Sequence, residues 1–85
     1  MKRRSLARQA NIRRIMRLLG APDPLIIELT ELPIDFSVKP GERGLCDIHF
    51  WSEEDLHLGM EVAKRHNSKI EFHLSNGHHK MELLY

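Results

Sequence analysis

The sequence is poor in cysteine and aromatic residues, and it has no long apolar run. Its single cysteine, Cys46, excludes an internal disulfide and a zinc site built from several cysteines. No stretch approaches the roughly 20 apolar residues that a membrane-spanning helix needs, and the start lacks the apolar centre of a signal peptide. We therefore expect a soluble, cytoplasmic protein without a membrane partner.

The length of 85 residues limits what the chain can do. It favours one domain over residues 1–85. A chain of this size buries only about 60–65% of its unfolded surface, which does not suit a deep catalytic cleft with a separate lid. A large multi-substrate enzyme is therefore excluded.

Acidic residues are absent from the first twenty positions, which carry seven lysines and arginines. The rest of the chain carries six bases and twelve acids, so the net charge of +1 conceals a basic segment joined to an acidic domain. Apolar residues recur there with helical spacing at Ile12, Ile15, Met16 and Leu19. We predict a basic helix over 1–20, ended by Gly20, whose first half buries little and frays or orders only on a partner.

Two interpretations of segment 24–32 stay open. Asp23 has the position of a helix cap and Pro33 that of a helix terminator, and the apolar spacing between them suits a helix. The β-branched residues of the same segment favour a strand instead. The signals at both ends make the helix the preferred interpretation.

From Ile34 the apolar period changes to two, on both sides of the loop 40–44. This alternation predicts a β-hairpin with one apolar and one polar face. The predicted pairs are Ile34 with Phe50, Phe36 with Ile48, and Val38 with Cys46. Asp35 then lies opposite His49 on the polar face.

A further helix and a second hairpin complete the chain. Ser52 has the context of a helix N-cap, and Gly59 lets the helix approach the sheet closely. Asn76 and Gly77 form the favoured two-residue hairpin turn, because both turn positions need positive φ. The register that follows puts five apolar residues on the core face: Ile70, Phe72, Leu74, Met81 and Leu83.

These elements combine into an α+β fold of two layers in the order α-[α]-ββ-α-ββ, where the bracketed helix is segment 24–32. The two hairpins form an antiparallel four-stranded sheet with the helices on one face, because each hairpin has one apolar face to cover. Residues 34–85 form the ββαββ core of this domain.

No set of residues has the spacing of a catalytic or metal site. Six histidines are a high count, but none has HxxxH or HExxH spacing, and polar residues commonly cover the open face of a sheet. Cys46 falls on the core side of its strand, where a thiol behaves as a small apolar group. We therefore expect no enzyme activity, no cofactor and no metal.

The basic helix is the strongest functional lead. The planar fork of arginine suits phosphate, and about six such contacts would give a steep salt dependence. The first hypothesis is a small nucleic-acid-associated regulatory protein that contacts the phosphate backbone with little sequence readout. Its predicted nucleic-acid-binding residues are Arg3, Arg4, Arg8, Arg13, Arg14 and Arg17.

Charge segregation also supports two other hypotheses. A protein-binding module or inhibitor would dock on a larger nucleic-acid-handling assembly through charged surfaces. Its predicted protein-contact residues are Asp35, Asp47, His49, Glu71 and His73. A homodimer would instead form if the basic helix of one copy docked on the acidic sheet face of another.

Overall fold

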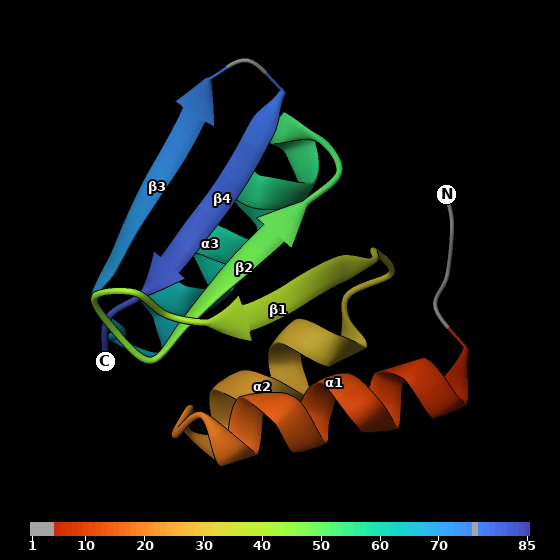
Figure 1. Ribbon diagram of the computed structural model, residues 1–85. Helices are drawn as coiled ribbons and strands as arrows, with labels where there is room; N and C mark the ends of the chain where they lie inside the picture. Colours follow the sequence, from red (N-terminus) through yellow and green to blue (C-terminus); the bar gives the residue numbers. More distant parts are fainter. Residues whose placement is uncertain (1–4, 76) are drawn as a thin grey trace.

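The computed structural model describes residues 5–75 and 77–85 and has an α+β fold of two layers (Figure 1). Its elements are α1 (Leu6–Leu18), α2 (Asp23–Glu31), β1 (Phe36–Pro40), β2 (Cys46–Phe50), α3 (Glu53–Arg65), β3 (Ile70–Ser75) and β4 (His78–Leu83). The strands form one antiparallel sheet in the order β1-β2-β4-β3, with the helices on one face and the other face open. The predicted fold class and element order are confirmed.

Helix α1 begins at a cap that the apolar pattern did not reveal. Ser5 accepts a hydrogen bond from the Arg8 amide at 3.2 Å, which satisfies one of the free N–H groups at the helix start. Ile12 and Met16 are buried in the core, as their spacing predicted. The looseness of the first turns stays a prediction, and residues 1–4 lie outside the described part of the chain.

Helix α2 covers most of the segment for which two interpretations were open. Leu25, Ile26 and Leu29 are fully buried, so packing outweighs the strand preference of the β-branched residues. The N-cap residue is Pro22, which makes no side-chain hydrogen bond, and the prediction of Asp23 as the cap is wrong. Asp23 is the first helical residue, where a carboxylate is favourable at the positive end of the helix.

The predicted register of the first hairpin is wrong by two residues. Phe36 pairs with Phe50 rather than with Ile48, and the last pair joins Pro40 to Cys46. The strand extends to Pro40 because an edge strand tolerates a proline, which has no N–H to contribute to the ladder. A shift of two residues keeps every side chain on its predicted face, so the apolar face still meets the core.

Two residues predicted to pair inside this hairpin lie just before it. Ile34 is 2% exposed and belongs to the core, although it precedes β1. Asp35 does not lie opposite His49, whose partner in the ladder is Ser37. The structural reason is the same displacement of the register.

Helix α3 has the predicted cap and the predicted close approach to the sheet. Ser52 accepts a hydrogen bond of 3.1 Å from the Asp55 amide. A Cβ atom on Gly59 would lie 2.3 Å from Cζ of Phe50, so only glycine lets the helix lie this near β2.

The second hairpin has the predicted register, with Phe72 opposite Met81. Gly77 has a φ of +81°, as the turn requires, and Asn76 lies outside the described residues. Met81 is fully buried, but Phe72 and Leu74 are 51% and 38% exposed, so their predicted place in the core is wrong. They lie on the outermost strand, whereas α3 lies behind β2 and β4 (Figure 1).

Candidate functional site

Two arginines of α1 form ion pairs within the chain. Arg8 donates from Nε to Asp35 Oδ1 at 2.9 Å and from Nη2 to the Phe36 carbonyl at 3.1 Å. Arg17 Nε pairs with Asp23 Oδ1 at 2.7 Å. These contacts join α1 to the start of β1 and to the start of α2, so part of the basic charge is neutralised internally.

Thr30 is the centre of a second attachment between α1 and α2. Arg13 Nε donates to Thr30 Oγ1 at 2.7 Å, and the same hydroxyl donates to the Ile26 carbonyl at 2.7 Å. Gln9 Nε2 adds a hydrogen bond of 2.8 Å to the Thr30 carbonyl. Polar side chains therefore help to hold the basic helix in place, which apolar periodicity does not indicate.

Arg14 lies on the outer side of α1 and is exposed. Its side-chain hydrogen bond within the described residues goes to Asn11 Oδ1 on the same helix, at 3.1 Å. Arg17 exposes 54% of its side chain despite its ion pair, and Arg3 and Arg4 lie outside the described residues. Of the predicted nucleic-acid-binding residues that the structure describes, Arg8 and Arg13 attach the helix, Arg14 faces solvent, and Arg17 pairs with Asp23 while about half of its side chain stays exposed.

Asp35 belongs to the attachment of α1. Partial burial opposes its ionisation, but hydrogen bonds from Arg8 and from Trp51 Nε1 outweigh this effect and hold the pKa of Asp35 below its ordinary value. The sequence grouped Asp35 with residues of the open sheet face. The structure places it beside α1 instead.

The open face of the sheet carries the other four predicted protein-contact residues: Asp47, His49, Glu71 and His73. Alternate residues of each strand point to this face, opposite the core. One row across the strands is Lys39, Asp47, Glu82 and Glu71, and the next is Ser37, His49, Lys80 and His73. A mainly acidic row thus lies beside a mainly basic one.

Glu82 is the best-satisfied carboxylate of the acidic row. It is 6% exposed and accepts hydrogen bonds from Arg43 Nη2 at 2.9 Å and from His73 Nε2 at 2.7 Å, with Lys80 Nζ at 3.5 Å. Burial opposes its ionisation, but these donors hold the pKa of Glu82 below its ordinary value. Arg43 also pairs with Glu71, which relieves the repulsion between two directly opposed carboxylates.

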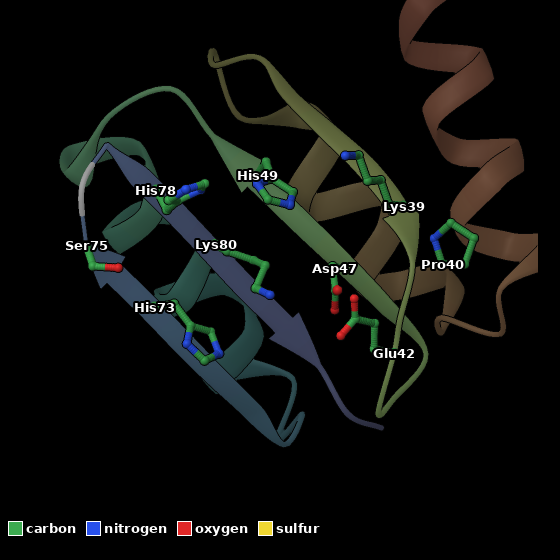
Figure 2. Close-up of a pocket in the computed structure, with 9 residues that line it drawn as sticks. All are labelled: Lys39, Pro40, Glu42, Asp47, His49, His73, Ser75, His78 and Lys80. Atoms are coloured by element: carbon green, nitrogen blue, oxygen red, sulfur yellow. The ribbon is translucent and has the colours of Figure 1, made fainter.

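A hollow of about 430 Å³ opens on this face, as Figure 2 shows. Its lining residues are Lys39, Pro40, Glu42, Asp47, His49, His73, Ser75, His78 and Lys80. The pKa of His49 is lowered, first by partial burial and then by Lys39 and Lys80, against the opposing effect of Asp47. The lysines therefore dominate the electrostatic potential at this imidazole.

Asp47 is the least satisfied group in the hollow. It is 7% exposed, yet no hydrogen bond or ion pair reaches its carboxylate from within residues 5–75 and 77–85. In the ladder it lies between Lys39 and Glu82. A buried carboxylate without a donor is unusual, because most buried polar groups have a hydrogen-bond partner.

Comparison with known proteins does not extend this picture. No family model, curated protein or solved structure matches the chain. Of the helices that the structure describes, none has the length and apolar character to span a membrane. The guide to function is therefore the arrangement of the side chains themselves.

Two groups have the composition of a metal site or a nucleophile, but their surroundings oppose both roles. Glu71, His73 and Glu82 present ligand atoms within 4.8 Å of one another. Arg43 pairs with both carboxylates, so its guanidinium already supplies the positive charge that a metal ion would bring. Burial raises the pKa of the Cys46 thiol to about 12, which disfavours the nucleophilic thiolate.

Arg43 is missing from the residues predicted from the sequence. The register of the second hairpin already set Glu71 directly opposite Glu82, and like charges at that spacing need a cation nearby. The need for a cation near these two carboxylates could therefore be predicted from the sequence. The pairing of β2 with β4, which brings the loop of Arg43 beside Glu82, could not be predicted.

Proposed function

We propose that the protein associates with nucleic acid through phosphate contacts on the outer side of α1. The observation that supports this most is that Arg14 and Arg17 face solvent on a helix without acidic residues. Arg17 uses Nε for Asp23, and its guanidinium has further donors for a phosphate. Three more bases precede α1 in the sequence, at positions 2–4.

The contact would be electrostatic and largely independent of base sequence. Phosphate contacts fix the position of a protein on nucleic acid and carry no base information directly. This favours an accessory or regulatory protein, which binds without catalysing a reaction.

Fluorescence anisotropy with labelled duplex and single-stranded oligonucleotides at low salt tests this proposal. We expect the wild-type chain to bind and the double variant Arg14→Gln with Arg17→Gln to bind at least about tenfold more weakly, because each charge-assisted contact is worth about 1.5–3 kcal/mol. The ion pair of Arg17 is exposed and worth less than about 1 kcal/mol, so the variant keeps its fold.

A matched control removes the same two charges from another surface. Lys64 and Arg65 lie in the last turn of α3, and Arg65 exposes 59% of its side chain. Lys64→Gln with Arg65→Gln should leave binding close to wild type. Equal losses in both double variants, or no binding by the wild-type chain at low salt, would show that α1 is not the contact surface.

Asp47 favours a second candidate function, the docking of a protein partner on the open sheet face. A partner side chain with an ammonium or guanidinium group would satisfy its carboxylate. A carboxylate of the same partner would meet Lys39 and Lys80, which line the same hollow. The proposed docking site thus takes both signs of charge within one patch.

Quantitative affinity capture from a lysate, with the purified chain as bait, tests this second candidate. Asp47→Asn with Lys80→Gln removes one charge of each sign from the hollow, and Glu54→Gln with Lys64→Gln does the same on α3. We expect one stoichiometric protein on the wild-type chain and on the α3 variant, but not on the hollow variant. The second candidate function would be contradicted if the hollow variant retained the same protein as the wild-type chain, or if no protein were retained.

A further inference from the structure

The fold protects one edge of the sheet and leaves the other open. At β1, Arg8 donates to the Phe36 carbonyl at 3.1 Å, Pro40 has no N–H, and α1 and α2 lie alongside the strand (Figure 1). No described element runs along the outer edge of β3 (Figure 1). Because an unprotected edge strand is a template for pairing with another strand, β3 is the edge at which a partner can add.

The exposed side of β3 is also apolar. Phe72 and Leu74 are 51% and 38% exposed, although they lie on the same face of the sheet as the fully buried Met81. Adjacent apolar side chains on an unprotected strand favour coverage by another surface. The strand therefore offers both apolar area and backbone hydrogen-bonding groups.

The free backbone groups belong to these same apolar residues. Lys69 directs its backbone groups toward the end of β4, with a bond of 2.9 Å to the Tyr85 carbonyl and one of 2.8 Å from the Leu84 amide. Backbone groups alternate in direction along a strand, so the odd-numbered residues of β3 also face β4. The outward groups are those of Ile70, Phe72 and Leu74.

We propose that two copies of this chain pair through β3, antiparallel and centred on Phe72, so that their two four-stranded sheets become continuous. In this register Phe72 lies opposite Phe72 of the second copy, and Ile70 lies opposite Leu74. The three residues with outward backbone groups then form about six hydrogen bonds between the copies. The exposed apolar side chains of both copies cover one another on the helix side of the sheet.

Polar side chains on the open face favour a second copy as the occupant and favour this register. Glu71 lies opposite His73 of the second copy, twice about the twofold axis, at the closely spaced positions of the ladder. A register centred on His73 would oppose the two histidines and pair Glu71 with Ser75, which loses both complementary contacts. The edge strand is thus complementary to itself in polar side chains, apolar surface and backbone direction.

This dimer differs from the one suggested by charge segregation, in which the basic helix docks on an acidic sheet face. Helix α1 lies beside β1, at the opposite side of the sheet from β3 (Figure 1). Pairing through β3 therefore leaves Arg14 and Arg17 accessible. The dimer and the nucleic-acid contact can be tested independently.

Sedimentation velocity over a range of protein concentrations tests the dimer. We expect the wild-type chain to sediment as a dimer at high concentration and Leu74→Lys to be monomeric. Leu58→Lys is the matched control, because Leu58 is also 38% exposed but lies on α3. Circular dichroism verifies the fold of each variant. A wild-type monomer up to millimolar concentration, or a dimer that Leu74→Lys leaves intact, would overturn the proposal.

A charge exchange tests the register itself. Glu71→Lys removes the carboxylate that faces His73 of the second copy, and His73→Glu sets two carboxylates opposite each other, so each variant should dimerise poorly. Both changes also alter contacts within the chain, with Arg43 and with Glu82, so circular dichroism verifies the fold of each variant. In a mixture, the introduced lysine faces the introduced glutamate while the second site keeps its native pair. We expect the mixed dimer to form at least about tenfold more tightly than either homodimer. A mixture that associates no better than its components would exclude this register.

Discussion

At the scale of single residues, Asp47 and Glu82 are neighbours in the ladder with nearly equal burial and unequal surroundings. Glu82 has Arg43, His73 and Lys80 as partners, whereas Asp47 has no partner within the described residues. Burial without a donor costs free energy that a charge-compensated group does not lose. We therefore expect the first carboxylate to stabilise the sheet and the second to contribute little to its stability.

Neutralising these two carboxylates should change stability in opposite directions. Asp47→Asn removes a carboxylate that has no hydrogen-bond or ion-pair partner within the described residues, and it should raise the midpoint of urea unfolding. Glu82→Gln leaves Arg43 and Lys80 with one carboxylate fewer and should lower it. Urea titrations followed by circular dichroism at neutral pH compare the two variants with the wild type. Shifts of the same sign would contradict the difference in their surroundings.

Asp35 should make stability depend on pH in the acid range. Its pKa in the folded chain is below the ordinary value, so its ionised form stabilises the fold at neutral pH, and this stabilisation is lost as the pH falls through the depressed pKa. Asp35→Asn should therefore be less stable than the wild type at neutral pH, and the difference should shrink toward about pH 3. Thermal unfolding across this range measures the difference, and a constant gap would argue against the ion pair with Arg8.

Gly59 should not tolerate a methyl group. Alanine normally favours a helix over glycine by about 1 kcal/mol. Here its Cβ atom would lie 2.3 Å from the ring of Phe50, so we expect Gly59→Ala to destabilise the fold by about 1–3 kcal/mol. Leu58→Ala on the exposed side of the same helix should cost less than about 0.5 kcal/mol. Stabilisation by Gly59→Ala in chemical denaturation would mean that helix and sheet lie further apart.

At the scale of elements, local signals predicted more than long-range ones. The turn around Gly77 specified the register of the second hairpin, and Ser52 marked the start of α3, because both depend on residues close in sequence. The predicted register of the first hairpin was wrong by two residues. A five-residue loop is compatible with more than one register, and no local signal excludes Pro40 from the strand. A shift of two residues does not change the alternation of side chains, so each side chain was still assigned to the correct face of the sheet.

The candidate site was also predictable only in part. Alternation along the strands placed Asp47, His49, Glu71 and His73 on one open face, and the structure brings them together there. The hydrogen-bond partners of the arginines were not predictable. Helical periodicity indicates which face of α1 a residue lies on, but it does not indicate which acceptors of α2 and β1 lie against that face. Arg13, for example, donates to Thr30 Oγ1 on α2, a contact that the periodicity of α1 does not indicate.

Helix α1 depends on a small apolar contact as well as on its polar attachments. Met16 is fully buried and Leu18, on the same helix, is 80% exposed. We expect Met16→Ala to destabilise the fold by about 2–5 kcal/mol and Leu18→Ala to cost less than about 0.5 kcal/mol. Urea unfolding of both variants measures the difference. Similar costs would mean that the polar contacts alone hold the helix.

At the scale of the whole molecule, the segregation of charge along the sequence is only partly a segregation in space. Arg8 and Arg17 form ion pairs with Asp35 and Asp23, which joins the basic segment to the acidic remainder. The basic surface of α1 that remains exposed is therefore smaller than the charge pattern of the sequence suggested. Three surfaces result: the outer side of α1, the hollow on the open face, and the free edge of β3.

The salt dependence of oligonucleotide binding tests most directly the central claim, that Arg14 and Arg17 contact phosphate. Each phosphate contact on duplex DNA contributes about 0.9 to the slope of log K against log salt concentration. We predict a steep slope for the wild-type chain, a slope shallower by about two for Arg14→Gln with Arg17→Gln, and a wild-type slope for Lys64→Gln with Arg65→Gln. Equal slopes for the wild-type chain and the α1 variant, or no binding at low salt, would contradict it.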